Sequence, residues 1–301
     1  MVGKGRSTEE LSWNHRCTMS LILMWIGFFL LLLLLEALFP LRHRTRTLAR
    51  RLIVNLCVSA FAFVVAAFVV RPVGLSLAAW TTEKPFGLLH IMALPAAVRF
   101  ALAFLLMDLT FYYWHLANHM IPGLWRFHNV HHIDPDLDVS TALRFHVGEV
   151  LLSAAFRVVQ VGLIGLPPLT YMIYESVFQG STLFHHSNVR LPLRAERLLN
   201  KILVTPRMHG IHHSVVQNET NSNYSVIFAW WDRLHSSLRL DIPQAAIVIG
   251  VPAYREPADN TLWDVLSLPF RPQRDYWRWP DGSRSMRDIA ETTDARAQMM
   301  E

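Results

Sequence analysis

The chain has 301 residues, of which 52% are hydrophobic and only 17% are charged. This charged fraction is below the roughly 25% of a typical soluble domain, and the composition excludes a disordered chain. Two cysteines, Cys17 and Cys57, are too few for a disulfide framework or a cysteine zinc site. A net charge of +5 often indicates a protein that binds nucleic acid, but here the predicted membrane topology explains much of the positive charge.

Two apolar segments near the N-terminus are predicted to span a membrane. Residues 19–39 provide about twenty apolar residues, the length that a bilayer core requires. A signal peptide is the alternative, but the apolar run is too long and no small-residue cleavage site follows it. Residues 52–70 form the second segment. The loop between the two predicts a cytoplasmic position, because it carries five arginines: Arg42, Arg44, Arg46, Arg50 and Arg51.

The next part of the chain alternates between loops and apolar segments. Residues 71–95 contain prolines and glycines and are predicted to be a loop with interfacial aromatic side chains. Residues 96–114 are predicted to form a third span. Residues 148–184 are apolar with a Gly-Leu-Pro-Pro break, which predicts a helical hairpin. If successive spans cross the membrane in alternating directions, the histidine-rich segments lie on the same side of the membrane as the arginine loop.

We therefore expect an all-α integral membrane protein with three to four spans, a re-entrant or hairpin pair, and a cytoplasmic histidine-rich helical cap. Residues 1–95 are predicted to be an N-terminal transmembrane region and residues 96–240 the catalytic domain. Residues 241–301 are predicted to be a polar C-terminal region, poorly ordered from residue 272.

Twelve of the fifteen histidines lie between residues 115 and 235. His115 and His119 share a helix face, as a pair of metal ligands would. Two histidines at a helix end near the membrane interface explain this pattern equally well. Two triplets have the same His-x-x-His-His spacing, which brings three imidazoles toward one centre on a helix. Their repetition favours a metal site over two solvated turns. The triplets are His128, His131 and His132, and His209, His212 and His213.

Three further histidines lie between the triplets. His186 is predicted to be a metal ligand, whereas His146 and His185 are predicted to support ligands. Imidazole suits zinc, copper, iron and nickel, and a closed zinc site takes only four ligands. The histidines are too many for one zinc ion, so they predict two adjacent metal ions. Beside a bilayer, such a centre suits oxygen chemistry on a lipid chain.

Over roughly residues 100–240 the chain resembles the fatty acid hydroxylase/sterol desaturase superfamily, whose members are integral membrane non-haem di-iron oxygenases. The pair and both triplets correspond to the three histidine boxes of that superfamily. Residues 144–149, 184–188 and 223–234 resemble the elements around the boxes. One departure follows Arg233, where His235 stands in place of an expected aromatic residue and the next glycine is missing; His235 is not counted as a ligand.

The resemblance implies a lipid hydroxylase or desaturase that uses two iron ions, O₂ and external electrons on a sterol, fatty acyl or related substrate. It implies nine iron ligands: His115, His119, His128, His131, His132, His186, His209, His212 and His213. It also implies that further side chains orient the ligands through hydrogen bonds: Asp108, Asn188, Asp232 and Arg233.

The chain contains no dinucleotide motif, haem-binding signature or cysteine cluster, which implies a separate NAD(P)H-linked carrier, either cytochrome b5-like or a ferredoxin with its reductase. The basic residues 42–51 and 190–207 are predicted to dock that carrier or, equally, anionic lipid headgroups. Two alternatives stay open. A zinc-dependent membrane hydrolase would need a glutamate inside a box, and neither triplet has one. A non-enzymatic metal-binding membrane protein would place its ligands inside the spans.

Overall fold

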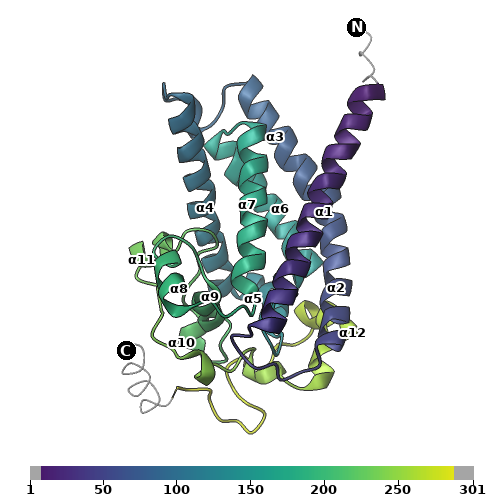
Figure 1. Cartoon of the computed structure of the whole chain (residues 1–301), viewed down its shortest axis with the longest axis vertical. Coiled ribbons are helices and arrows are strands. Elements are labelled where there is room, and N and C mark those ends of the chain that lie inside the picture. The colour runs from purple at the N-terminus through teal and green to yellow at the C-terminus, as the bar shows by residue number, and fades with distance from the viewer. Residues whose placement is uncertain (1–7, 288–301) are drawn as a thin grey trace.

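The computed structural model describes residues 8–287, with side chains described from residue 23 onward (Figure 1). Regular structure in this range is helical, with only isolated β-bridges between extended segments. The helices are α1 (Thr8–Leu38), α2 (Leu48–Val65), α3 (Arg71–Glu83), α4 (Ala96–Met120), α5 (Pro122–His132), α6 (Val147–Ile164), α7 (Pro168–His186), α8 (Leu193–Leu199), α9 (Pro206–His212), α10 (Gln217–Thr220), α11 (Trp230–Leu234) and α12 (Leu262–Ser267).

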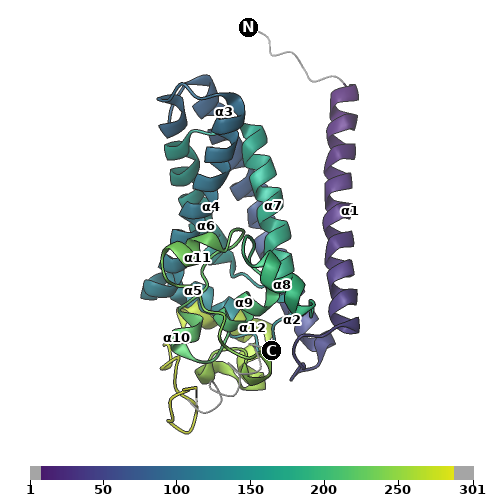
Figure 2. The same ribbon diagram turned by 60° about the vertical axis from the view of Figure 1, so that its left-hand side comes forward.

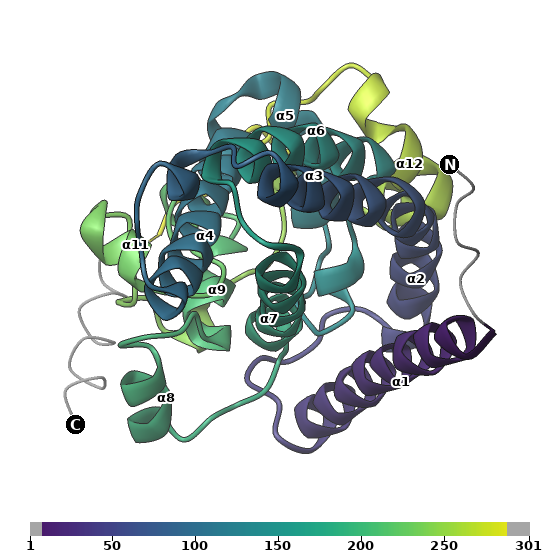
Figure 3. The same cartoon turned by 90° about the horizontal axis from the view of Figure 1, so that it is seen from above.

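The long helices run side by side, and the short helices gather at one end of the bundle (Figures 1 and 2). Viewed along the bundle, α7 lies between α4, α3 and α6, with α1 at the periphery (Figure 3). Helix α1 contacts the bundle in part through Leu32, which packs with Leu183 of α7 and Val139. This arrangement joins an apolar bundle to a compact end that carries the histidines.

Three helical stretches of the described residues are long and apolar enough to cross a membrane: Leu48–His90, Ala96–Met120 and Val147–Ile164. In α1, where side chains are described from residue 23, the described apolar stretch is Leu23–Leu38. Large apolar side chains on these helices are exposed, among them Phe63, Phe68 and Leu163. A soluble protein would bury such side chains, so the structure confirms the prediction of a helical integral membrane protein.

The prediction of a loop directly after residue 70 was wrong. α2 passes through the π-helical turn Ala66–Val70 into α3 without leaving the helix. Pro72 lies in the first turn of α3, where a missing N–H costs little, and the wider π turn precedes it. Gly74 allows α3 to pack against α7, because a Cβ atom there would lie 2.3 Å from the hydroxyl of Tyr171. Pro72 and Gly74, two of the residues that suggested a loop, therefore lie inside a helix.

The hairpin predicted at the Gly-Leu-Pro-Pro break is formed by α6 and α7. Gly165 ends α6 with φ 72°, a left-handed conformation that glycine adopts without strain. Pro168 then begins α7 with its φ already suited to a helix. The turn at Gly165 packs closely on the segment between α3 and α4, because a Cβ atom on Gly165 would lie 2.2 Å from the carbonyl oxygen of Phe86. Both open ends of the hairpin therefore reach the histidine-bearing end.

The C-terminal region packs on the bundle more extensively than its polar composition suggested. Val251, Val265 and Leu268 are buried against Val58 of α2 and Trp125 of α5. The described part of the predicted disordered tail also makes defined contacts, since residue 287 ion-pairs with the α10 region. Residues 288–301 of that prediction lie outside the described residues.

Candidate metal centre

The histidines lie in the last turns of four helices that end close together. α4 ends with His115 and His119, α7 ends with His186, and each triplet lies at the end of its own short helix, α5 or α9. Proline occupies the first turn of α5, α7 and α9, so each start is fixed by a residue whose φ suits a helix. Packing of α4 on α5 and of α7 on α9 then brings the four helix ends together.

The nine predicted ligands form two buried groups, and within each group the ligand nitrogens all lie within 4.8 Å of one another. The five-histidine group contains His115, His119, His128, His132 and His212. The four-histidine group contains His131, His186, His209 and His213. The groups are adjacent, because the rings of His132 and His213 stack with centroids 4.4 Å apart. Each triplet contributes to both groups.

The Nε2 atoms within the groups approach one another as closely as hydrogen-bonded atoms. The Nε2 atom of His186 lies 2.9 Å from Nε2 of His131 and 2.9 Å from Nε2 of His209. A neutral imidazole carries one proton, so this many converging nitrogens cannot all be satisfied by hydrogen bonds among themselves. Both ring nitrogens of His119 and the Nε2 atom of His212 are buried without a hydrogen-bond partner. Converging, unsatisfied nitrogen lone pairs fit metal ions.

Backbone carbonyls fix the orientation of several rings through Nδ1. The Nδ1–H groups of His115, His186 and His212 donate to the carbonyl oxygens of Tyr224, Thr182 and Ser222, each at 2.7 Å. A carbonyl only accepts, so Nδ1 holds the proton and the lone pair is on Nε2, directed into the group.

A carboxylate orients one further ring. The Nδ1–H group of His128 donates to Oε1 of Glu149, in the first turn of α6, at 2.8 Å. Glu149 was part of the noted sequence pattern of residues 144–149 but was not predicted to orient a ligand. The signal that could have identified it is a carboxylate three residues after His146, at the start of a helix that returns to the histidine end.

Burial keeps the histidines in the neutral form that binds metals. For His131, His209 and His213, burial and the surrounding imidazoles lower the pKa well below its usual value. Burial lowers the pKa of His132 and His212 in the same way. These side chains are therefore uncharged at neutral pH without any bound ion, and each presents a lone pair.

Two of the predicted supporting residues lie next to the groups. His185 is outside both groups, and its ring centroid is 4.2 Å from that of His209. Its Nδ1 atom is 3.1 Å from the carbonyl oxygen of Val226. Asp232 accepts hydrogen bonds from the backbone N–H groups of Tyr224 and Ser225 at 2.8 and 2.9 Å. Asp232 therefore fixes the peptide whose carbonyl orients His115.

The other predicted supporting residues bind elsewhere among the described residues. Asp108 accepts from the indole N–H of Trp231 and the backbone N–H of Phe228. Asn188 pairs with the backbone of Arg42, joining the loop before α2 to the end of α7. Arg233 donates to the backbone and side chain of Asn200, and His146 caps α6 by accepting from the N–H of Gly148. None of the four hydrogen-bonds a histidine of either group in the described structure.

The basic segment 42–51 is not an open docking surface along its whole length. Arg51 is buried, and its Nε atom donates to Asp134 at 2.7 Å, while Nη1 donates to Asp138. Arg144, also buried, donates from Nε to the carbonyl oxygen of Val130 in the second box, at 2.8 Å. This network could not be read from the local sequence, because the three aspartates that follow the second box pair with Arg51, which precedes them by more than eighty residues.

Comparison with known proteins adds independent information. The family described as "Fatty acid hydroxylase" matches residues 100–237, a range that contains all nine histidines. This match and the relatives below show that residues 100–237 resemble the fatty acid hydroxylase/sterol desaturase superfamily.

Human cholesterol 25-hydroxylase is 30% identical over 138 residues, covering 45% of this chain and 49% of the relative. Ornithine lipid hydroxylase OlsE of Rhizobium tropici is 32% identical over 140 residues, covering 46% and 41%. Alkylglycerol monooxygenase of Danio rerio is 32% identical over 154 residues, covering 48% and 32%. The chain therefore spans about half or less of the length of these relatives. No solved structure matches the chain significantly.

Proposed function

We propose that this chain is a membrane-bound oxidoreductase that holds two iron ions in its two histidine groups and uses O₂ to hydroxylate or desaturate a lipid. The observation that carries the proposal is the pair of adjacent, buried groups of five and four histidines at the end of an apolar bundle. The names of the relatives support it, since all three denote enzymes that hydroxylate or oxygenate lipids.

Iron fits the reaction better than zinc. When bound, iron supplies the redox chemistry that O₂ activation requires, whereas zinc has none. A hydrolytic zinc site would need a glutamate inside a histidine box, and neither triplet has one. Hydroxylation consumes one C–H bond, O₂, two electrons and two protons, and yields one C–OH group and one water. Desaturation removes two hydrogens and yields two waters.

The residues of the chain have three tasks in this reaction. Neutral imidazoles hold the metal ions with Nε2 atoms that the carbonyls of residues 182, 222 and 224 aim inward. Burial of all nine histidines keeps bulk water from the reacting centre. The apolar helix α4 ends at the histidines and α6 begins beside them, so a lipid chain in the membrane can lie close to the centre.

We also propose that the histidine end faces the cytoplasm. The arginine-rich loop lies at that end, since the backbone N–H of Leu41 donates to the carbonyl oxygen of Asn188 at 2.8 Å. Residues 96–240 would then form the cytoplasm-facing catalytic domain, with residues 1–95 as the membrane region before it and residues 241–301 as the polar region after it. A reporter that is active only in the cytoplasm, fused after Asp241, is expected to be active; activity of an exported reporter at the same site would contradict this orientation.

Metal analysis combined with mass spectrometry of lipid products tests the function. The purified protein is expected to contain two irons per chain, and its expression is expected to produce a hydroxylated or desaturated lipid. Replacing His131 or His212 with alanine is expected to remove iron and product. His43→Ala is the control, because His43 is exposed and lies outside both groups. One zinc per chain would support the hydrolase, and a loosely held mixture of metals without product would support the non-enzymatic alternative.

A further inference from the structure

Two tryptophans form a continuous ring contact from the five-histidine group to the surface. The ring centroid of Trp125, a buried residue of α5, is 4.9 Å from that of His119 and 5.2 Å from that of His132. Trp277, from the C-terminal region, stacks on Trp125 with centroids 5.9 Å apart and planes 28° from parallel. Trp277 is partly buried and packs at the edge of the hydrophobic cluster that contains Trp125.

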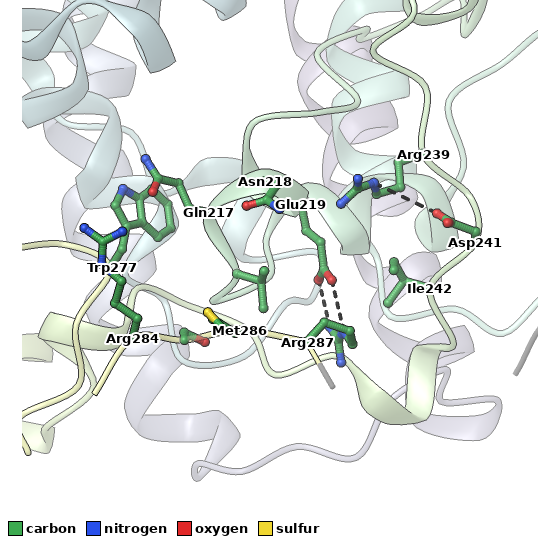
Figure 4. A pocket seen from close by; sticks show the side chains of 12 residues that line it. Gln217, Asn218, Glu219, Arg239, Asp241, Ile242, Trp277, Arg284, Met286 and Arg287 are labelled. Carbon is green, nitrogen blue, oxygen red and sulfur yellow. Dashed lines mark hydrogen bonds and ion pairs between the residues drawn. The ribbon is translucent and has the colours of Figure 1, made fainter. Parts of the chain in front are cut away.

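Trp277 also lines a cavity of about 390 Å³ at the polar end of the molecule. Residues 216–219 of the cavity wall follow the third histidine box directly, and residues 239–242 and 284–287 complete it. Figure 4 shows Trp277 at one side of this cavity and Arg239 at the other, with paired Glu219 and Arg287 between them. The Trp277 ring therefore lines the cavity and also contacts the Trp125 ring, which reaches the histidines.

The charges around the cavity favour an acidic partner. Arg287 and Glu219 neutralise each other in a two-bonded ion pair at 2.7 and 2.9 Å. Arg239 lies 4.0 Å from Asp241, and both side chains are partly exposed. Arg284 is exposed, and among the described residues its side chain makes no hydrogen bond or ion pair. Three arginines against two acids leave a positive surface beside Trp277.

We propose that this cavity is the docking site of an acidic one-electron carrier protein, and that the Trp277–Trp125 pair conducts electrons from that carrier to the metal centre. The inference rests on the proposed function, which needs two external electrons per turnover. Each transfer oxidises one carrier molecule by one electron and reduces the metal centre by one, so two reduced carriers are consumed per product. Arg284 and Arg239 attract acidic side chains of the carrier.

Competing routes fit less well. Within residues 42–51, one of the two basic segments that the sequence suggested for docking, Arg42 and Arg51 are buried and engaged with other residues. A second series of ring contacts runs from His119 through Tyr224 and Tyr112 to Tyr113 and to His235, and none of these rings lines the cavity. Tyr113 lies within a candidate membrane span, where a soluble carrier has no access.

The experiment uses the iron-loaded full chain with two acidic carriers as probes, a cytochrome b5 haem domain and a [2Fe–2S] ferredoxin. Stopped-flow absorbance measures the rate at which each reduced carrier is reoxidised. Trp277→Leu is expected to slow reoxidation by about tenfold or more, because the ring contact that positions the route is lost. Trp277→Tyr, which keeps an aromatic ring, is expected to restore most of the rate. Trp279→Leu is the matched control, since Trp279 contacts Arg255 and not Trp125.

Docking is measured separately on the metal-free protein. Arg284→Glu is expected to raise the Kd for the carrier by about tenfold at low salt, with a smaller effect at high salt, because the interaction is electrostatic. Arg50→Glu is the control, because Arg50 is an exposed arginine in the first turn of α2 and does not line the cavity. Equal effects of the two substitutions, or no binding of either carrier to the unsubstituted protein, would overturn the docking site.

Product formation driven by hydrogen peroxide separates this inference from the proposed function. Peroxide supplies both oxygen and oxidising equivalents, so conversion of C–H and H₂O₂ to C–OH and H₂O needs no carrier. Trp277→Leu is expected to keep its iron and its peroxide-driven product. A full rate of carrier reoxidation in Trp277→Leu would overturn the route. Absence of iron from the unsubstituted protein, or of product under both conditions, would instead overturn the proposed function.

Discussion

Removal of the Glu149 carboxylate tests how the protein tunes one of its two histidine groups. Among the nine histidines of the described structure, His128 alone has a carboxylate on Nδ1, and the contact is 2.8 Å long. His128 belongs to the five-histidine group, and Glu149 is buried. Glu149→Ala therefore removes both the acceptor that orients the ring and the negative charge that makes Nε2 a stronger donor to a metal.

The expected effect can be bounded. Loss of such a partner typically weakens metal binding by about 10–100-fold, or about 1.4–2.8 kcal/mol at 1.4 kcal/mol per tenfold. Glu149→Gln keeps an oxygen that accepts from Nδ1–H but removes the charge. A hydrogen bond to a charged group contributes about 1.5–3 kcal/mol against about 0.5–1.5 kcal/mol for a neutral one, so the glutamine variant should lose about 1 kcal/mol, or roughly fivefold in affinity.

The assay is a competition titration of Fe²⁺ against a chromophoric chelator under anaerobic conditions, which resolves two binding steps. Only one step is expected to weaken, because the four-histidine group contains neither His128 nor a neighbour of Glu149. Glu83→Gln is the control, since Glu83 is exposed at the end of α3. Unchanged affinity in Glu149→Ala, or equal weakening of both steps, would refute the assignment of Glu149 to one group.

Three further predictions test other parts of the structure. His186→Ala is expected to lose iron and activity, whereas His185→Ala is expected to keep iron and lose only part of its activity; the reverse result would place the ligand one residue earlier. Arg51→Met is expected to lower stability by about 3–5 kcal/mol in thermal unfolding, because it leaves buried aspartates unpaired, while Arg50→Met should have little effect. Gly165→Ala is expected to lower the Tm, because φ 72° costs a side chain about 1–2 kcal/mol before any clash; an unchanged Tm would contradict this.

The sequence predicted the elements whose signals are local. Helical spacing identified both triplets as metal-ligating, although it placed each triplet at one centre and the structure divides each between two adjacent groups. The Gly-Leu-Pro-Pro break indicated the hairpin that returns the chain to the histidines. Pro72 and Gly74 were misinterpreted because their role depends on a partner. Gly74 is needed only because Tyr171 of α7 packs against it, and Pro72 is tolerated only because a π turn precedes it.

Long-range charge pairing was the other feature that local reasoning missed. The arginine loop was counted as free positive charge, which wrongly suggests an open surface at Arg42 and Arg51. Burial lowers the pKa of Arg42 to about 10, so it stays charged at neutral pH and bonds to Pro206 and Gln244. Such partners are distant in sequence, and composition carries no information about them.

The division of each triplet between the two groups follows from helix geometry. Successive residues turn by about 100°, so in a His-x-x-His-His triplet the first and last histidines lie about 40° apart, while the middle one lies about 60° to the other side. His128 and His132 accordingly share the five-histidine group, and His131 joins the other. His209 and His213 share the four-histidine group, and His212 joins the first.

The first triplet therefore gives two ligands to the five-histidine group and one to the four-histidine group, and the second triplet does the reverse. A displacement of α5 relative to α9 would disturb both groups at once, so the two sites can be kept only if these short helices are held rigidly. The buried contacts around them serve that purpose: Arg144 holds the carbonyl of Val130 within the second box, and Asn223 donates to the carbonyl of Met208 beside the third, each at 2.8 Å. The duplicated spacing thus requires polar support from outside the boxes, which is why the residues that hold this centre extend from α2 to the C-terminal region.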